Sequence, residues 1–125
     1  MPVSCSFVGE PFVISGAISR ELLMVVREAV YNAVLHGHPR EITISVRYEA
    51  QRLLLTVFDD GIGFHRDKIP VEGHYGITGM RERMEQIGGS FALDSAPLAG
   101  TRVRLSLARN VLLSKAGSGQ RWAMN

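Results

Sequence analysis

Apolar residues recur at helical spacing in the first third of the chain: Leu22, Val25, Val26, Ala29, Val30 and Ala33. Ser19 stands just before them, and its hydroxyl can accept a hydrogen bond from a backbone amide of a first helical turn. Gly37 and Pro39 come after them, and both residue types end helices. We therefore predict one amphipathic helix over residues 19–36, preceded by a short edge strand at residues 11–14.

The remaining pattern predicts strands at residues 41–48, 52–58, 90–96 and 101–108. A second helix is predicted from Ile77 to Ile87, with Thr78 as its cap, and residues 59–75 before it have the composition of a loop. The order is therefore strand, helix, two strands, loop, helix, two strands. It predicts the α+β class: a two-layer α/β sandwich whose mixed, mostly antiparallel sheet carries helices on one face.

The composition is that of a single globular domain, with 125 residues, 46% hydrophobic and 21% charged. We assign residues 1–108 to this domain and residues 109–125 to a flexible C-terminal tail. From Ser95 onward the chain has basic residues and no acidic ones. We expect a solvated basic end there, not a nucleic-acid-binding surface.

Cys5 is the only cysteine, which excludes an internal disulfide and a cysteine-rich metal site and fits a reducing compartment. No apolar run approaches the ~20 residues that span a bilayer, and the N-terminus lacks a signal-peptide pattern. We expect a cytoplasmic chain with no membrane contact of its own, whether or not its parent protein is membrane-anchored.

Polar residues at four-residue spacing follow one border of the first predicted helix. Glu28, Asn32 and His36 form a single shallow stripe beside the apolar face, because each step of four turns a helix by about 400°. An exposed polar edge is the ordinary explanation of such a stripe. Taken alone, it does not establish a site.

The segment FDDGIGF, residues 58–64, follows an apolar strand and has several explanations. Asp-Gly after a strand is a hairpin signal, but no alternating return strand follows it. A calcium-binding EF-hand loop is excluded, because its twelfth position is Pro70 where a glutamate is needed. Ligand contact is the remaining explanation. An acid at a strand end can accept a hydrogen bond from an amino group, and Gly61 and Gly63 let the backbone approach a ligand.

Glycines 73, 76 and 79 lie around the start of the second predicted helix. Backbone amides in such a turn, together with the positive end of a helix, suit phosphate oxygens. The spacing matches neither a P-loop nor a dinucleotide-binding fingerprint. Arg66 and Lys68 in the preceding loop add positive charge, although isolated loop cations are usually solvated.

In combination, these segments resemble the ATP-binding domain shared by sensor histidine kinases, gyrase-type topoisomerases and heat-shock chaperones. EAVYNAVLH (28–36) resembles the family's N box, DDGIGF (59–64) its first glycine box, and HYGITGMRERMEQIGG (74–89) its second. Gly100-Thr101 resembles a late glycine–threonine pair. The resemblance spans about residues 10–108, and the second box is similar to that of nitrate- and lipid-sensing histidine kinases.

The resemblance implies a role for each matching residue. Asn32 is expected to bind the Mg²⁺ that bridges the phosphates of ATP, and Glu28 to act in catalysis by orienting water or accepting a proton. His36 is expected to contact the nucleotide without being phosphorylated. The other expected nucleotide contacts are Asp59 (to the adenine amino group), Gly61 and Gly63 (beside base and ribose), His74, Gly76 and Ile77 (at the phosphates) and Thr101 (under the adenine).

The function implied is the Mg-ATP-binding catalytic domain of a two-component sensor histidine kinase. Its partners would be ATP, the parent's dimerisation and phosphoacceptor domain and, indirectly, a response regulator. The four histidines at 36, 38, 65 and 74 lie inside the nucleotide motifs or their loops, so we expect no self-phosphorylation of the isolated chain. The alternatives are a stand-alone anti-sigma-factor serine kinase of the same fold and a nucleotide-binding module without transferase activity.

Overall fold

The computed structural model describes residues 2–63 and 71–112, without the side chains of residues 71–75. These residues form β1 (Val3–Val8), α1 (Gly16–Asn32), a π-helical segment (Ala33–Gly37), β2 (Ile42–Tyr48), β3 (Arg52–Asp59), α2 (Val71–Gln86), β4 (Ser90–Ser95), β5 (Thr101–Ala108) and a 3₁₀ turn (Arg109–Val111). The order of strands and helices is the predicted one.

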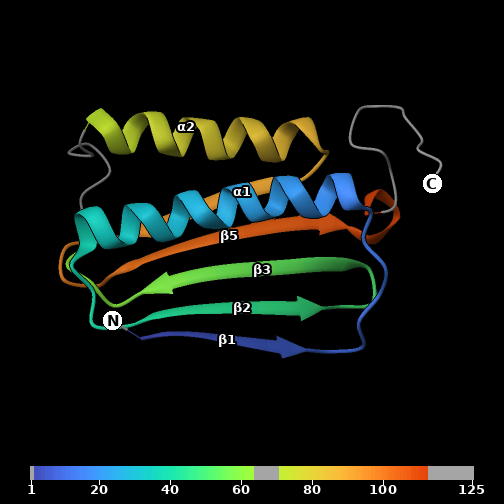
Figure 1. Ribbon diagram of the computed structural model, residues 1–125, viewed down its shortest axis with the longest axis horizontal. Helices are drawn as coiled ribbons and strands as arrows, with labels where there is room; N and C mark the ends of the chain where they lie inside the picture. The colour runs from blue at the N-terminus through green and yellow to red at the C-terminus, as the bar shows by residue number, and fades with distance from the viewer. Residues whose placement is uncertain (1, 64–70, 113–125) are drawn as a thin grey trace.

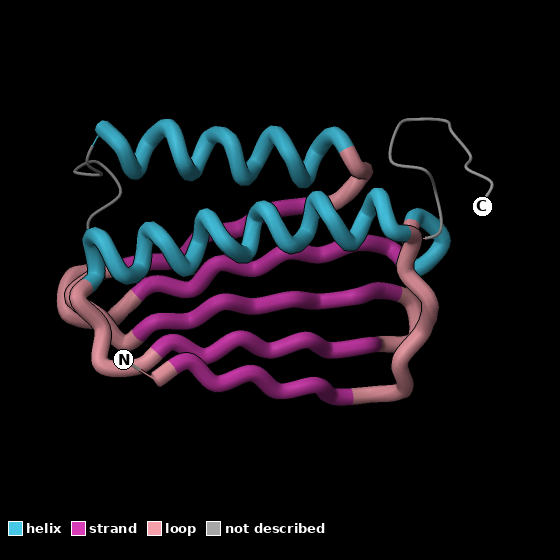
Figure 2. The backbone as a smooth tube through the Cα atoms, in the orientation of Figure 1, coloured by secondary structure: helices cyan, strands magenta, loops and turns pink. Residues whose placement is uncertain are grey.

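The strands form one five-stranded sheet in the order β1-β2-β3-β5-β4. β1 runs parallel to β2, and the other neighbours are antiparallel. α1 and α2 lie side by side over one face of the sheet (Figures 1 and 2). The predicted α+β sandwich with a mixed sheet and helices on one face is therefore confirmed.

The core lies between this helix layer and the inner face of the sheet. Along β3, alternate residues point inward and are buried: Leu53, Leu55, Val57 and finally Asp59. Ile18, Leu22 and Val25 of α1 pack against them from above. The strand's own alternation thus turns Asp59 inward, at a position where an apolar residue would be expected.

The N-terminal elements differ from the prediction. Residues 11–14 are not a strand, and the N-terminal strand is β1, whose serine and apolar residues alternate. α1 starts at Gly16, because Ser15, not Ser19, is its N-cap: the Ser15 hydroxyl accepts a hydrogen bond from the Ile18 amide at 3.2 Å. At its other end α1 continues into the π-helical segment.

α2 also starts earlier than predicted, at Val71 and not at Ile77. The expected loop over residues 59–75 is therefore wrong from residue 71 onward, as are the glycine turn before the helix and the cap at Thr78. Glycines weaken a helical signal, so the pattern was visible only where Met80, Met84 and Ile87 pack on the core. Packing outweighs this weak propensity.

The packed domain extends past residue 108. After β5 the 3₁₀ turn carries Leu112 into the core, where it is 0% exposed. The Leu112 carbonyl accepts a hydrogen bond from the Ser15 amide at 2.8 Å, which ties this turn to the start of α1. The predicted tail therefore begins no earlier than residue 113, and residues 113–125 lie outside the described ones. No described helix has the length and apolar character to cross a bilayer.

Candidate functional site

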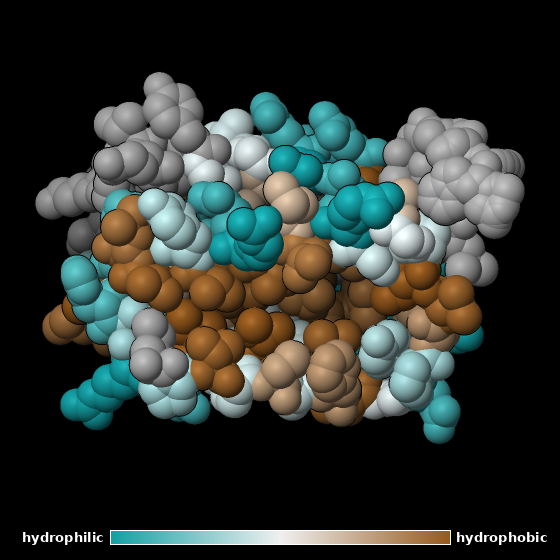
Figure 3. Space-filling view, viewed as in Figure 1, coloured by the Kyte–Doolittle hydropathy of each residue, from teal (hydrophilic) through white to brown (hydrophobic). Residues whose placement is uncertain are grey.

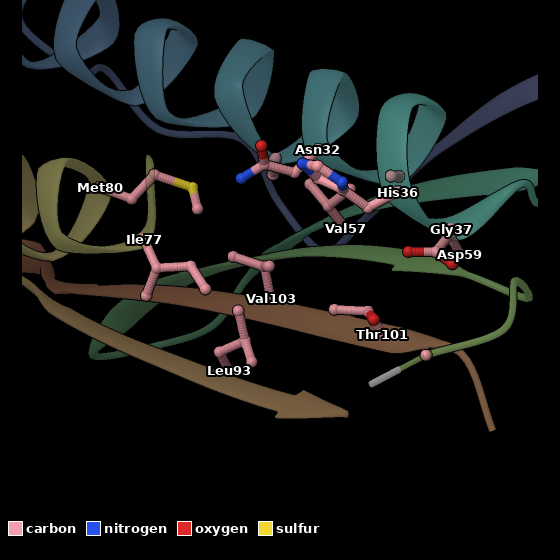
Figure 4. A pocket seen from close by; sticks show the side chains of 13 residues that line it. Asn32, His36, Gly37, Val57, Asp59, Ile77, Met80, Leu93, Thr101 and Val103 are labelled. Atoms are coloured by element: carbon pink, nitrogen blue, oxygen red, sulfur yellow. The ribbon is translucent and has the colours of Figure 1, made fainter. Parts of the chain in front are cut away.

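A pocket lies between the C-terminal part of α1, the middle of α2 and the end of the sheet (Figure 4). Its walls are mostly apolar: Ala29, Ala33, Val57, Ile77, Met80, Leu93 and Val103. Asn32, His36, Asp59 and Thr101 add polar groups. An apolar cleft with a few converging polar groups is the usual form of a small-molecule site.

Asp59 is the buried acid of this pocket, with 3% of its surface exposed. Its Oδ1 accepts a hydrogen bond from the Gly61 amide at 2.8 Å. Burial raises the pKa of Asp59, and the neighbouring charge of Asp60 adds to the rise, while the Gly61 hydrogen bond opposes it. The pocket therefore contains a carboxyl group that can accept a hydrogen bond and is shielded from water.

Asp60 has the opposite environment, although it is the next residue. Its Oδ1 accepts hydrogen bonds from the amides of Arg40 at 2.9 Å and Glu41 at 3.0 Å. The bond from Glu41, with that from Arg40, lowers the pKa of the exposed Asp60 carboxyl. Asp60 thus joins the end of β3 to the loop before β2, and it does not line the pocket.

The glycines after Asp59 serve close backbone packing. A Cβ at Gly61 would collide with the carbonyl of Gly37, whose oxygen also accepts a hydrogen bond from Ile62 at 2.9 Å. Gly63 has a φ of 64°, and a Cβ there would collide with the Ala96 carbonyl. Gly63 lines the pocket and Gly61 does not, so the structure gives Gly61 a role in packing.

Asn32 and His36 project from α1 and the π-helical segment toward the pocket (Figure 4). His36 Nε2 is buried and has no hydrogen-bond partner among the described residues. Such an unpaired buried nitrogen costs free energy unless a ligand or water satisfies it. The predicted stripe therefore brings two of its members, Asn32 and His36, into one site.

Glu28, the third member, lines the neighbouring groove between α1 and α2, together with Gly76 and Gly79. A Cβ at Gly76 would collide with Glu28 Oε2 and lie 3.1 Å from Asn32 Nδ2. Gly76 therefore lets α2 pass close over these two side chains. This position inside a helix differs from the predicted phosphate-binding turn.

The remaining predicted site residues are Thr101, Ile77 and His74. Thr101, at the start of β5, lines the pocket, and its Oγ1 lies 2.8 Å from Ser95 Oγ. Ile77 also lines the pocket, whereas the side chain of His74 lies outside the described ones. Sequence reasoning missed the apolar walls, although the inward alternation of β3 and β5 already pointed to Val57 and Val103.

Comparisons with known proteins agree with this geometry. Residues 17–111 match the family model "Histidine kinase-, DNA gyrase B-, and HSP90-like ATPase". The sensor protein VraS of Staphylococcus saprophyticus is 36% identical over 101 residues, covering 81% of this chain and 29% of VraS. The nitrate/nitrite sensor protein NarQ of Escherichia coli is 41% identical over 86 residues, covering 68% of this chain and 15% of NarQ. The chain thus spans less than a third of these relatives.

Solved structures show the same fold. The ATP binding domain of PrrB from Mycobacterium tuberculosis is 26% identical, with a TM-score of 0.65 over 85% of this chain and 79% of that one. The Acinetobacter baumannii histidine kinase AdeS, at 17% identity, has a TM-score of 0.70 over 87% of this chain and 55% of that one. With the family model covering most of the chain, the resemblance seen in the sequence is confirmed: the chain belongs to the histidine kinase-, DNA gyrase B- and HSP90-like ATPases.

Proposed function

We propose that this domain binds Mg-ATP in the pocket beside Asp59. It then donates the γ-phosphoryl group to a histidine on the dimerisation and phosphoacceptor domain of a larger sensor histidine kinase. A response regulator would receive the phosphoryl group afterwards. The observation that carries the proposal is the buried carboxylate of Asp59 in the wall of an apolar pocket. The matches to sensor proteins favour a histidine kinase.

The adenine base would lie among the apolar side chains that line the pocket. Val57, Met80 and Val103 offer apolar contacts for a planar ring. Among the described residues, none donates a hydrogen bond to the second carboxylate oxygen of Asp59, so this oxygen is the natural acceptor for the exocyclic amino group of adenine. Thr101 would lie under the same side of the base.

The phosphates would extend toward α1 and α2. His36 Nε2 supplies a hydrogen-bonding group that has no partner within the described part of the chain. The described residues contain no cluster of three His, Cys, Asp or Glu side chains that could hold a metal. The amide oxygen of Asn32 fits Mg²⁺, an ion that retains water and phosphate ligands and needs few from protein. When bound, the ion would neutralise phosphate charge.

Glu28 is the proposed catalytic carboxylate. It lies one helical turn before Asn32 and packs against Gly76, at the border between the pocket and the groove. From there it can accept the proton of an incoming acceptor imidazole or orient that ring. His74, Gly76 and Ile77 remain proposed neighbours of the phosphates.

Calorimetry of ATP binding, with and without Mg²⁺, tests the nucleotide part of this proposal. Asp59→Asn keeps the size of the side chain but can present a donor to the adenine amino group. Losing a hydrogen bond to a charged acceptor costs about 1.5–3 kcal/mol, or roughly 10- to 150-fold in affinity. Asp60→Asn is the matched control and should bind ATP like the wild type. Equal binding by both variants would refute the role of Asp59.

Phosphoryl transfer needs a separate measurement. The isolated chain should incorporate no label from γ-labelled ATP, whereas the parent's phosphoacceptor domain, once added, should become labelled. Glu28→Gln should bind Mg-ATP normally but transfer about 100-fold more slowly, because general-base catalysis is worth that much or more. Transfer at the wild-type rate would remove Glu28 from the mechanism.

A further inference from the structure

β1 forms one edge of the sheet and is exposed at every residue. α2 packs on β4 at the far side of the sheet, and α1 contacts β3. The helix layer therefore leaves the β1 side uncovered (Figure 1). Phe7 is 67% and Val3 53% exposed there. Figure 3 shows a broad apolar surface that extends from α1 toward the β1 side of the sheet.

The edge of β1 lacks the usual protection. Natural edge strands are blunted by charges, prolines or bulges that prevent pairing with another chain. Residues 3–9 carry no charge and no proline, and Val, Phe and Cys favour an extended strand. Because the strand is uncharged, a second copy of it can approach without repulsion between like charges.

The register of β1 with β2 identifies the groups on the free edge. The Pro2 carbonyl accepts a hydrogen bond from the Ile42 amide at 3.1 Å. In a parallel pair, alternate residues bond to the same neighbour, so Ser4, Ser6 and Val8 face β2. The amides and carbonyls of Val3, Cys5 and Phe7 therefore point away from the sheet, and among the described residues no strand pairs with them.

We infer that two copies of this chain associate through an antiparallel pairing of β1 with β1, centred on Cys5. In this register Cys5 lies opposite the Cys5 of the second copy, and Val3 lies opposite its Phe7. Every outward amide and carbonyl of the three residues is then paired, and the arrangement has the two-fold symmetry usual for homodimers. This pairing also brings the exposed Phe7 side chain of one copy beside the Val3 side chain of the other, on the face of the sheet that carries the helices.

This pairing does not involve the nucleotide pocket, which is lined by residues of α1, α2, β3, β4 and β5 and by none of β1 or β2. The dimer is therefore independent of the proposed function. The interface is a single short strand, so we expect weak association with a dissociation constant between about 10 µM and about 1 mM.

Sedimentation equilibrium of the wild-type chain over this concentration range gives the first test. Cys5→Pro removes an amide that faces outward, so it should abolish the dimer and leave the β1–β2 bonds intact. Phe7→Lys places a charge on the edge and should raise the dissociation constant at least tenfold. Both variants should keep the wild-type circular dichroism spectrum and ATP affinity.

Thiol crosslinking tests the register. Paired Cys5 residues would have Cα atoms about 5.5 Å apart, so a short bifunctional thiol reagent should join them. A Cys5→Ser, Val8→Cys variant is the matched control. Its thiols would lie about 20 Å apart in the proposed register and should not be joined. A monomer at every concentration, a dimer that survives both Cys5→Pro and Phe7→Lys, or equal crosslinking in the control would overturn the proposal.

Discussion

Asp59 and Asp60 are neighbours in the chain with opposite chemical environments. β3 turns Asp59 into the core, where burial raises its pKa. Asp60 points outward and accepts backbone hydrogen bonds that lower its pKa. The sequence motif alone shows two acids at a strand end. The alternation of β3 decides between them, because Asp59 continues the inward series of Leu55 and Val57.

These pKa shifts predict opposite dependences of stability on pH. A raised folded-state pKa means that Asp59 favours folding while protonated, and this contribution is lost as the pH rises through its pKa. Nucleotide-free Asp59→Asn should therefore be more stable than the wild type at pH 7 and lose this advantage below about pH 4. Urea denaturation between these pH values measures it.

Asp60→Asn provides the contrast. The lowered pKa of Asp60 means that its contribution is present above its unfolded pKa and is lost as the pH falls. The variant should be less stable than the wild type at pH 7, with a smaller loss of stability on acidification. If both variants shift stability in the same direction at pH 7, the assignment of the two environments is wrong.

At the scale of elements, the sequence predicted β2, β3, β4 and β5 closely, because one wet face gives strands a clear period of two. It misplaced both helix starts. Ser15 and Ser19 are both plausible caps in sequence. The choice depends on a tertiary contact, because the Ser15 amide donates a hydrogen bond to the Leu112 carbonyl after the C-terminal 3₁₀ turn. The start of α2 was hidden because Gly76 and Gly79 obscure the helical pattern.

The cap of α1 can be tested with two serines. Ser15→Ala removes the acceptor of the Ile18 amide and should lower the free energy of unfolding by about 1 kcal/mol. Ser19→Ala lies inside the helix on an exposed position and should change stability little or raise it slightly. Chemical denaturation of both variants compares them, and a larger loss in Ser19→Ala would identify Ser19 as the cap.

The glycines of α2 provide a second matched pair. Apart from the neighbouring backbone of α2, no heavy atom of the described residues lies within 4 Å of a Cβ at Gly79. Gly79→Ala should therefore stabilise the domain by about 1 kcal/mol through helix propensity. Gly76→Ala makes the same local change but would displace Glu28 Oε2, so it should gain less stability and weaken Mg-ATP binding. Equal gains and equal ATP affinity would show that Gly76 needs no such space.

At the scale of the whole molecule, the sandwich and its family could be predicted from the order of elements and motifs. The position of the pocket walls could not, since it depends on how α1, α2 and the sheet come together. The domain boundary was also hidden, because the apolar run Val111-Leu112-Leu113 after the last strand is too short to show a helical or strand period. Only the packed structure shows it as buried.

Leu112→Ala tests this boundary. Leu112 is 0% exposed, so its truncation should cost about 2–5 kcal/mol in the free energy of unfolding. Val13→Ala is a suitable control, because Val13 is 75% exposed and the change should stay within about 0.5 kcal/mol. Thermal or urea denaturation compares the two, and a similar small effect for both would place Leu112 outside the folded domain.

The most direct measurement of the central claim compares ATP with purine riboside triphosphate, which lacks only the amino group that Asp59 is proposed to recognise. The wild type should bind ATP at least tenfold more tightly, which corresponds to about 1.4 kcal/mol. Asp59→Asn should lose this preference, because its amide cannot act as the same charged acceptor. Equal affinity of the wild type for the two nucleotides would contradict the role of Asp59 as the adenine acceptor.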